Sequence, residues 1–145
     1  MDRIQVELLH GYLEKARAKL RVARDLAQRG EWDDAVSRAY YAAFHAAQAA
    51  LLTEGQRGES HQGVLTLFGL LLVKTGKLDR KWGRVLANLK DDRETGDDEA
   101  MSWLDEESGR RAVEEAEGFV EAVDVYVARV IDQTAQTDDP AGESR

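Results

Sequence analysis

The stretch SRAYYAAFHAAQAALL, residues 37–52, decides the fold. It is rich in alanine, the residue with the highest helix propensity, and it predicts a helix. Tyr40, Phe44, Ala47 and Leu51 recur at intervals of three and four residues, so they share one apolar face that should be buried. The remaining alanines are small enough for another helix, or another subunit, to approach closely. This segment is therefore expected to be a tightly packed helix of a larger core.

A polar stripe runs along the same predicted helix. Arg38, Tyr41, His45 and Gln48 also follow the three-and-four spacing and should lie on one face. A helix that only fills a core does not need an arginine and a histidine there. Two interpretations stay open: the stripe lines a solvent-accessible cleft, or it forms a polar contact between helices or between subunits.

Further helices are predicted in the rest of the chain. Apolar spacing and helix-ending residues predict four further segments, with Gly30 and Gly76 at the ends of two of them and Ser60 as the N-cap of one. These segments are residues 4–28, 60–76, 78–89 and 105–131, and the central helix extends over 32–53. Residues 90–100, KDDRETGDDEA, are expected to be an acidic and mobile connection.

Alternating β-branched runs closed by tight turns, which indicate strands, are absent from the sequence. We therefore predict an all-α protein, an up-and-down helical bundle of four to five helices. Residues 1–133 should form one helical domain, and the polar residues 134–145 a disordered C-terminal tail.

Composition narrows the functional classes. The chain has 145 residues and no cysteine, which excludes disulfides and cysteine-ligated metal. No signal peptide or membrane-spanning run is recognised, so we expect a cytoplasmic protein without membrane contact. Its three histidines show no ligand spacing, so no metal site and no cofactor is expected.

The formal net charge of −8 argues against a surface that binds nucleic acid everywhere through phosphates. RNA would need a local basic patch. Basic residues are concentrated in the first predicted helix, whereas aspartate and glutamate dominate the last third of the chain. One face of an acidic protein can therefore be basic.

Residues 12–52, YLEKARAKLRVARDLAQRGEWDDAVSRAYYAAFHAAQAALL, resemble the HEPN domain (higher eukaryotes and prokaryotes nucleotide-binding). The resemblance is to the short prokaryotic branch with a YYAxFH motif, and it continues through SHQGVLTLF, where Ser60 and His61 match a serine-histidine pair of that branch. It implies a helical bundle that forms a homodimer. It also implies a nucleotidyltransferase-like partner in a toxin–antitoxin pair.

Many HEPN proteins are metal-independent RNases that use an arginine and a histidine separated by four to six residues. Arg38 and His45, with six residues between them, satisfy this spacing and are the candidate catalytic pair. Histidine can transfer a proton at the ribose 2′-hydroxyl near neutral pH, and arginine can hold the phosphate. In catalytic branches the motif lies later, where this chain has Arg93 and no following histidine.

The resemblance implies nucleotide or RNA binding, for which the candidate residues are Tyr41, Gln48, His61 and Arg93. The predicted function is that of a HEPN component of a toxin–antitoxin-like system that binds nucleotide or RNA; if it is a nuclease, it is a metal-independent RNase. The alternative is a non-catalytic homodimeric interaction module that retains the fold. The missing histidine after Arg93 favours the alternative, and the spacing of Arg38 and His45 favours the first interpretation.

Overall fold

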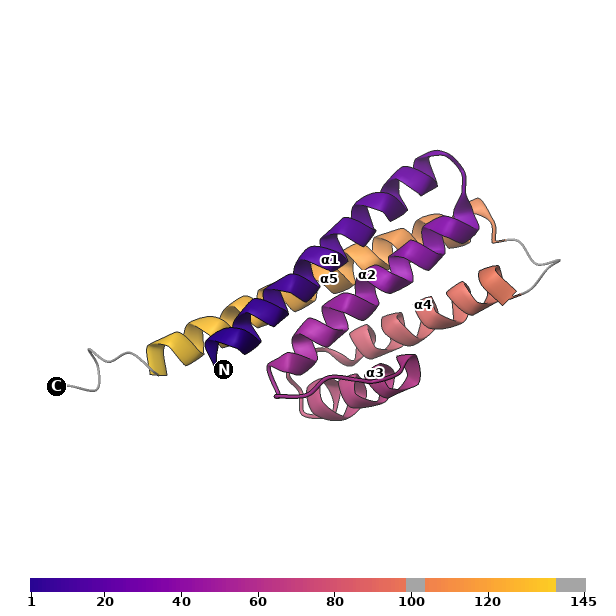
Figure 1. Ribbon diagram of the computed structural model, residues 1–145. Coiled ribbons are helices and arrows are strands. Elements are labelled where there is room, and N and C mark those ends of the chain that lie inside the picture. The colour runs from indigo at the N-terminus through magenta and orange to yellow at the C-terminus, as the bar shows by residue number, and fades with distance from the viewer. Residues whose placement is uncertain (99–103, 138–145) are drawn as a thin grey trace.

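The computed structural model describes residues 1–98 and 104–137 (Figure 1). These residues form five α-helices and one π-helical turn, without strands. In chain order they are α1 (Arg3–Gln28), α2 (Trp32–Leu52), α3 (His61–Phe68), the π-helical turn η1 (Gly69–Val73), α4 (Arg80–Asp98) and α5 (Glu106–Thr137). The prediction of an all-α helical bundle is confirmed.

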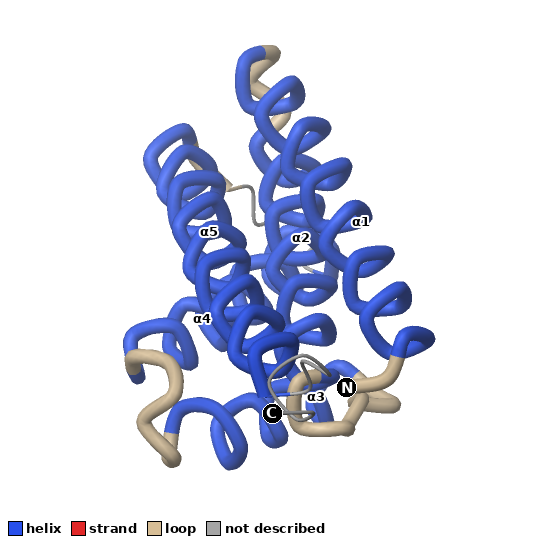
Figure 2. Tube along the Cα trace, turned by 90° about the vertical axis from the view of Figure 1, so that its left-hand side faces the viewer, coloured by secondary structure: helices blue, strands red, loops and turns tan. Residues whose placement is uncertain are grey.

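Helix α2 lies at the centre of the bundle. It packs against α1, α5, α4 and α3, and the long helices α1, α2 and α5 run side by side in both views (Figures 1 and 2). Helix α1 is antiparallel to α2, and the short α3 lies at the end of the bundle where α2 finishes (Figure 1). The alanines of α2 explain this position, because all seven between residues 39 and 50 are buried and leave room for several neighbours.

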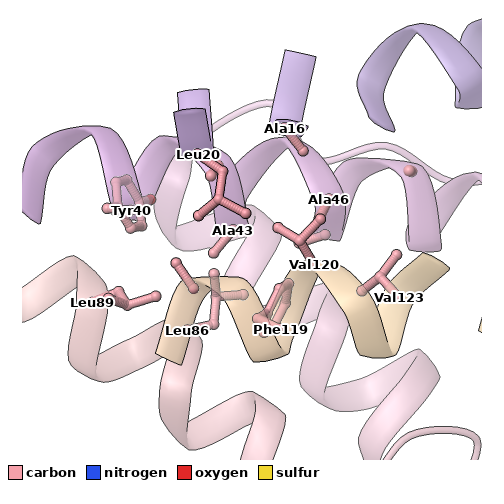
Figure 3. Packing of buried hydrophobic residues seen from close by; sticks show 14 of the residues in the cluster. Ala16, Leu20, Tyr40, Ala43, Ala46, Leu86, Leu89, Phe119, Val120 and Val123 are labelled. Atoms are coloured by element: carbon pink, nitrogen blue, oxygen red, sulfur yellow. The ribbon is translucent and has the colours of Figure 1, made fainter. Parts of the chain in front are cut away.

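The core is formed mainly by α1, α2 and α5, with fewer residues from α3 and α4; Figure 3 shows part of it. Tyr40, Ala47 and Leu51 of α2 are fully buried, as the apolar stripe predicted, and Phe44 is partly buried against the same core. Phe119 of α5 is fully buried, and its ring centroid lies 5.3 Å from that of Phe68 and 6.1 Å from that of Trp82. These three rings join α3, α4 and α5.

The predicted helix ends are present. Gly30 and Gly76 have φ angles of 74° and 79°, a left-handed conformation that glycine adopts without steric cost. The hydroxyl of Ser60 accepts a hydrogen bond of 2.9 Å from the amide of Gly63 and caps α3. Local residue chemistry therefore ends these helices.

Two predicted boundaries were wrong. Residues 90–98 do not form a mobile connection but continue α4 through Asp98, supported by ion pairs one turn apart, Lys90 with Glu94 and Arg93 with Asp97. Helix α5 continues to Thr137, beyond the predicted end at residue 131 and the domain boundary at residue 133. The rest of the predicted tail, residues 138–145, and residues 99–100 of the predicted connection lie outside the described residues.

None of the helices in the described part of the chain is both long enough and apolar enough to cross a membrane.

Candidate functional site

The extended helix α4 brings Arg93 onto two tyrosines of α2. The guanidinium carbon of Arg93 lies 5.2 Å from the ring centroid of Tyr41 and 5.7 Å from that of Tyr40. These distances are those of cation–π contacts. With Phe44 and His61, which pack against the same tyrosines, these residues form what we call the Tyr41 cluster.

Arg93 is only partly neutralised. Its Nε lies 3.1 Å from Oδ2 of Asp97, an ion pair on the same helix, but Nε makes no hydrogen bond within the described residues. The side chain of Arg93 is 24% exposed. The two terminal nitrogens of the guanidinium are therefore the groups that can reach a ligand, and this fork suits a phosphate.

His61 begins α3 and lies within the Tyr41 cluster. Its ring is stacked on Phe44 with centroids 4.8 Å apart and meets the ring of Tyr41 edge-on at 5.8 Å. Nδ1 of His61 lies 2.6 Å from the hydroxyl of Tyr40. The amino end of α3 adds backbone N–H groups at the same place, which favours an anion.

The bond between Tyr40 and His61 selects one tautomer of the imidazole. Tyr40 is 0% exposed, and burial raises the pKa of its hydroxyl, so the hydroxyl keeps its proton. That proton needs an acceptor, and within the described residues Nδ1 of His61 is the partner it has. Neutral His61 therefore carries its own proton on Nε2, which becomes a hydrogen-bond donor.

His45 packs beside Tyr41. Its ring centroid is 6.5 Å from that of Tyr41 and 6.2 Å from that of Tyr12 of α1, on which it is stacked. Nδ1 of His45 is buried and makes no hydrogen bond within the described part of the chain. Nε2 is therefore the ring nitrogen that is left for solvent or a ligand.

Arg38 lines a groove of about 430 Å³ between α1 and α2. Tyr41 lines the same groove, together with Val22, Leu26 and Asp34. Tyr41 thus connects three candidates: Arg93 lies over its ring, His45 packs beside it, and Arg38 shares its groove. The structure brings most of the predicted residues together around one tyrosine.

The HEPN domain family model matches residues 9–126 of this chain. The chain belongs to the HEPN family. The match includes all of α2 and α4, so it covers every residue of the Tyr41 cluster.

Relatives of similar length support this membership. A UPF0332 protein of Thermotoga maritima is 32% identical over 121 residues, 83% of this chain and 92% of that protein. A Methanocaldococcus jannaschii protein named "Putative toxin" is 34% identical over 125 residues, 86% of this chain and 87% of that protein. A second protein so named in that organism is 29% identical over 119 residues, covering 82% of this chain and 81% of that protein.

Gln48, unlike the other candidate binding residues, is buried and holds a loop. It is 4% exposed, its Nε2 donates to the carbonyl of Gly58 at 2.9 Å, and its Oε1 accepts from the amide of Gly58 at 3.0 Å. Both polar atoms of the side chain are therefore engaged. Gln48 holds the loop between α2 and α3, and we do not include it in the ligand-binding surface.

Sequence reasoning missed three residues of α1 that border the candidate site. Tyr12 is stacked on His45, and the positive charges of Lys15 and Lys19 act on the same histidine. The spacing of these three residues, i, i+3 and i+7, was the available signal, because it puts them on one face of α1.

Two histidines of the HEPN site resist protonation. The pKa of His45 is lowered from its ordinary value of 6.5 by burial and then by Lys15 and Lys19. The pKa of His61 is also lowered, by burial and then by Arg93 and Lys90, with Glu94 acting in the opposite direction. Both imidazoles are therefore neutral at pH 7.

These shifts predict that the protein is destabilised by mild acid. The unfolded chain gains protons at both histidines as the pH falls through 6.5, whereas the folded chain gains them only at lower pH. The free energy of unfolding should therefore be highest above this value and fall between about pH 7 and pH 5.5, still above the ordinary carboxyl pKa values.

Urea unfolding at the two ends of this range measures the effect. We expect the decrease in unfolding free energy to be smaller in His45→Gln and in His61→Gln than in the wild type, and smallest in the double variant. Equal decreases in all four proteins would show that other groups cause the pH dependence.

Proposed function

We propose that this chain is the toxin-like component of a two-component, toxin–antitoxin-like system and that it binds RNA at the Tyr41 cluster. The names of the two Methanocaldococcus jannaschii relatives support the first part of this proposal. The second part rests on the chemistry of the cluster.

The observation that carries the proposal is the position of Arg93 over Tyr41, beside His61. A guanidinium whose two terminal nitrogens make no hydrogen bond within the described residues provides the charge and the planar fork that a phosphate requires. His61 adds an Nε2–H donor, and the partly exposed rings of Tyr41 and His61 provide surfaces on which bases can stack. Charge, donors and aromatic faces in one place are what RNA recognition combines.

The same proposal includes partners. A second copy of the chain would form the homodimer that membership of the HEPN family suggests, and a nucleotidyltransferase-like protein would be the other component of the system. Coexpression of the chain with such a protein should relieve any growth defect that the chain causes alone.

If the chain is also an enzyme, the activity that we propose is RNA cleavage without a metal ion. His45 would transfer the proton of the ribose 2′-hydroxyl, and Arg38, two turns away on the same face of α2, would hold the phosphate. Neutral His45 has the protonation state that a general base needs, provided that its accessible nitrogen is the unprotonated one.

A non-catalytic interaction module remains the second candidate, and the histidine geometry favours it. Nδ1 of His61 is occupied by Tyr40, and Nδ1 of His45 is buried. Neutral His61 therefore presents an N–H donor rather than a base, which suits binding more than proton abstraction.

Incubation of purified protein with a mixed RNA pool in EDTA separates the two candidates. If the chain is a nuclease, cleavage should rise with protein concentration and fall at least 100-fold in His45→Ala, the usual order of loss when an acid or base is removed. Circular dichroism and thermal unfolding must show that the variant is folded. RNA binding without cleavage by either protein would establish the binding module, and the absence of both would refute the proposed function.

A further inference from the structure

The basic residues of α1 have two different environments. Arg17 and Arg24 face α5, where they form ion pairs with Asp124 at 2.6 Å and with Glu117 at 3.3 Å. Lys15 and Lys19 face the other way, and neither forms an ion pair within the described residues. The acidic helix α5 thus neutralises one side of α1 and leaves the other side positive.

The side of α1 that carries Lys15 and Lys19 presents a regular stripe of residues. Five residues of α1 follow the spacing i, i+3, i+7, i+10 and i+14 and share one face: Tyr12, Lys15, Lys19, Val22 and Leu26. At 1.5 Å per residue the stripe is about 20 Å long.

Contacts at both ends show what this stripe faces. At one end Tyr12 is stacked on His45, and at the other Val22 and Leu26 line the groove that contains Arg38 and Tyr41. Lys15 and Lys19 lie between these contacts along α1, which is antiparallel to α2 (Figure 1), and their positive charges act on His45. We call this surface, from Tyr12 and His45 to Val22 and Arg38, the α1–α2 seam.

We propose that the α1–α2 seam is a binding track for single-stranded RNA, in which Lys15 and Lys19 contact successive phosphates and Tyr12 stacks on a base. The inference rests on the proposed function and extends the RNA surface from the Tyr41 cluster across α2 to α1. It assigns a role to Tyr12, Lys15 and Lys19, which are not part of the candidate catalytic pair Arg38 and His45.

The chemistry of the seam fits this ligand. A track for single strands combines a line of positive charge with exposed aromatic faces, and every base has a face that can stack. Lys15 is exposed, while Tyr12 and Lys19 are partly exposed. Arg57, whose NH1 lies 3.5 Å from the hydroxyl of Tyr12, adds charge at one end, and Asp34 in the groove marks the other end.

The positive charge of the seam contrasts with the net negative charge of the protein. The chain carries a net charge of −8, so a nucleic acid that approaches most of its surface is repelled. Two lysines on one face of α1, without an ion pair within the described residues, would direct the strand to that face. The segregation of ion pairs on α1 is therefore what makes binding by an acidic protein feasible.

The salt dependence of RNA binding tests the inference. The probe is a short, unstructured, fluorescein-labelled oligoribonucleotide, titrated with full-length protein at several salt concentrations. Each phosphate contact that is lost should reduce the slope of log K against log salt concentration by roughly 0.7 for a single strand. In the Lys15→Gln, Lys19→Gln double variant the slope should therefore become shallower by roughly 1.4, with weaker binding at low salt.

A matched variant controls for the loss of charge. Lys74→Gln with Arg84→Gln removes the same two charges from exposed positions after η1 and in α4, and it should leave the slope as in the wild type. Tyr12→Leu should weaken binding several-fold with little change of slope, because stacking does not displace counterions.

The outcomes separate this inference from the proposed function. If the wild type binds RNA and the lysine variant has the slope of its control, the seam is not the track, although the proposed function stands. If polyglutamate displaces the RNA as well as an unlabelled RNA does, the seam is a general polyanion surface and the assignment is wrong. If the wild type does not bind RNA, both proposals fall.

Discussion

Replacement of Phe119 by alanine should lower the free energy of unfolding by about 3–5 kcal/mol. Phe119 is fully buried in α5 and contacts the rings of Phe68 and Trp82, so it joins three parts of the bundle. The variant loses the burial of a large apolar ring and leaves a cavity that helices on several sides cannot fill together. Such a loss is a large share of the stability expected of one domain.

Urea titration followed by circular dichroism measures this effect. Val125→Ala is the control, because Val125 lies on the same helix but is 52% exposed, and it should change the unfolding free energy by less than about 0.5 kcal/mol. A loss below about 1 kcal/mol in Phe119→Ala would contradict the packing of α5 onto α3 and α4 that the structure shows.

Replacement of Arg93 by alanine should weaken RNA binding by about 10- to 100-fold. The range corresponds to the loss of one charge-assisted hydrogen bond to phosphate, about 1.5–3 kcal/mol. Arg93 is the residue that brings a guanidinium to Tyr41, its Nε faces Asp97, and its terminal nitrogens make no hydrogen bond within the described residues. The effect should therefore appear in binding more than in folding.

Fluorescence titration of a labelled oligoribonucleotide measures the affinity of this variant. Arg93→Lys keeps the charge without the planar fork and should recover only part of the affinity. Arg84→Ala, which removes an exposed arginine from the same helix, should bind as the wild type does. Equal affinities of Arg93→Ala and the wild type, with unchanged thermal unfolding, would remove Arg93 from the proposed binding surface.

Much of the candidate site could be anticipated from residue types and local spacing. Arg38, Tyr41 and His45 share a face because the periodicity of a helix puts them there, and the structure keeps that arrangement. Gln48 has the same spacing and yet is buried, because the loop after α2 folds back and bonds its side chain through Gly58. The spacing predicts the face of a residue on its own helix, but not what covers that face.

Residues 90–98 illustrate the opposite error. Their acidic composition and glycine suggested a loop, but ion pairs one turn apart and the packing of Leu89 extend the helix. This extension carries Arg93 to Tyr41, more than 50 residues earlier in the chain. A contact between residues so far apart depends on how α4 lies against α2, which local composition does not encode.

The sequence by itself determined the class of fold, the core face of α2 and the helix ends at Gly30, Ser60 and Gly76. These features depend on interactions within a few residues, where periodicity, capping and backbone freedom act. Only the tertiary structure decided that Tyr40 directs the proton of His61, that Arg93 joins the Tyr41 cluster, and that Lys15 and Lys19 form no ion pair with the part of the chain that is described. Those features depend on the mutual packing of helices, because the neighbours of a side chain set its charge, its tautomer and its access to a ligand.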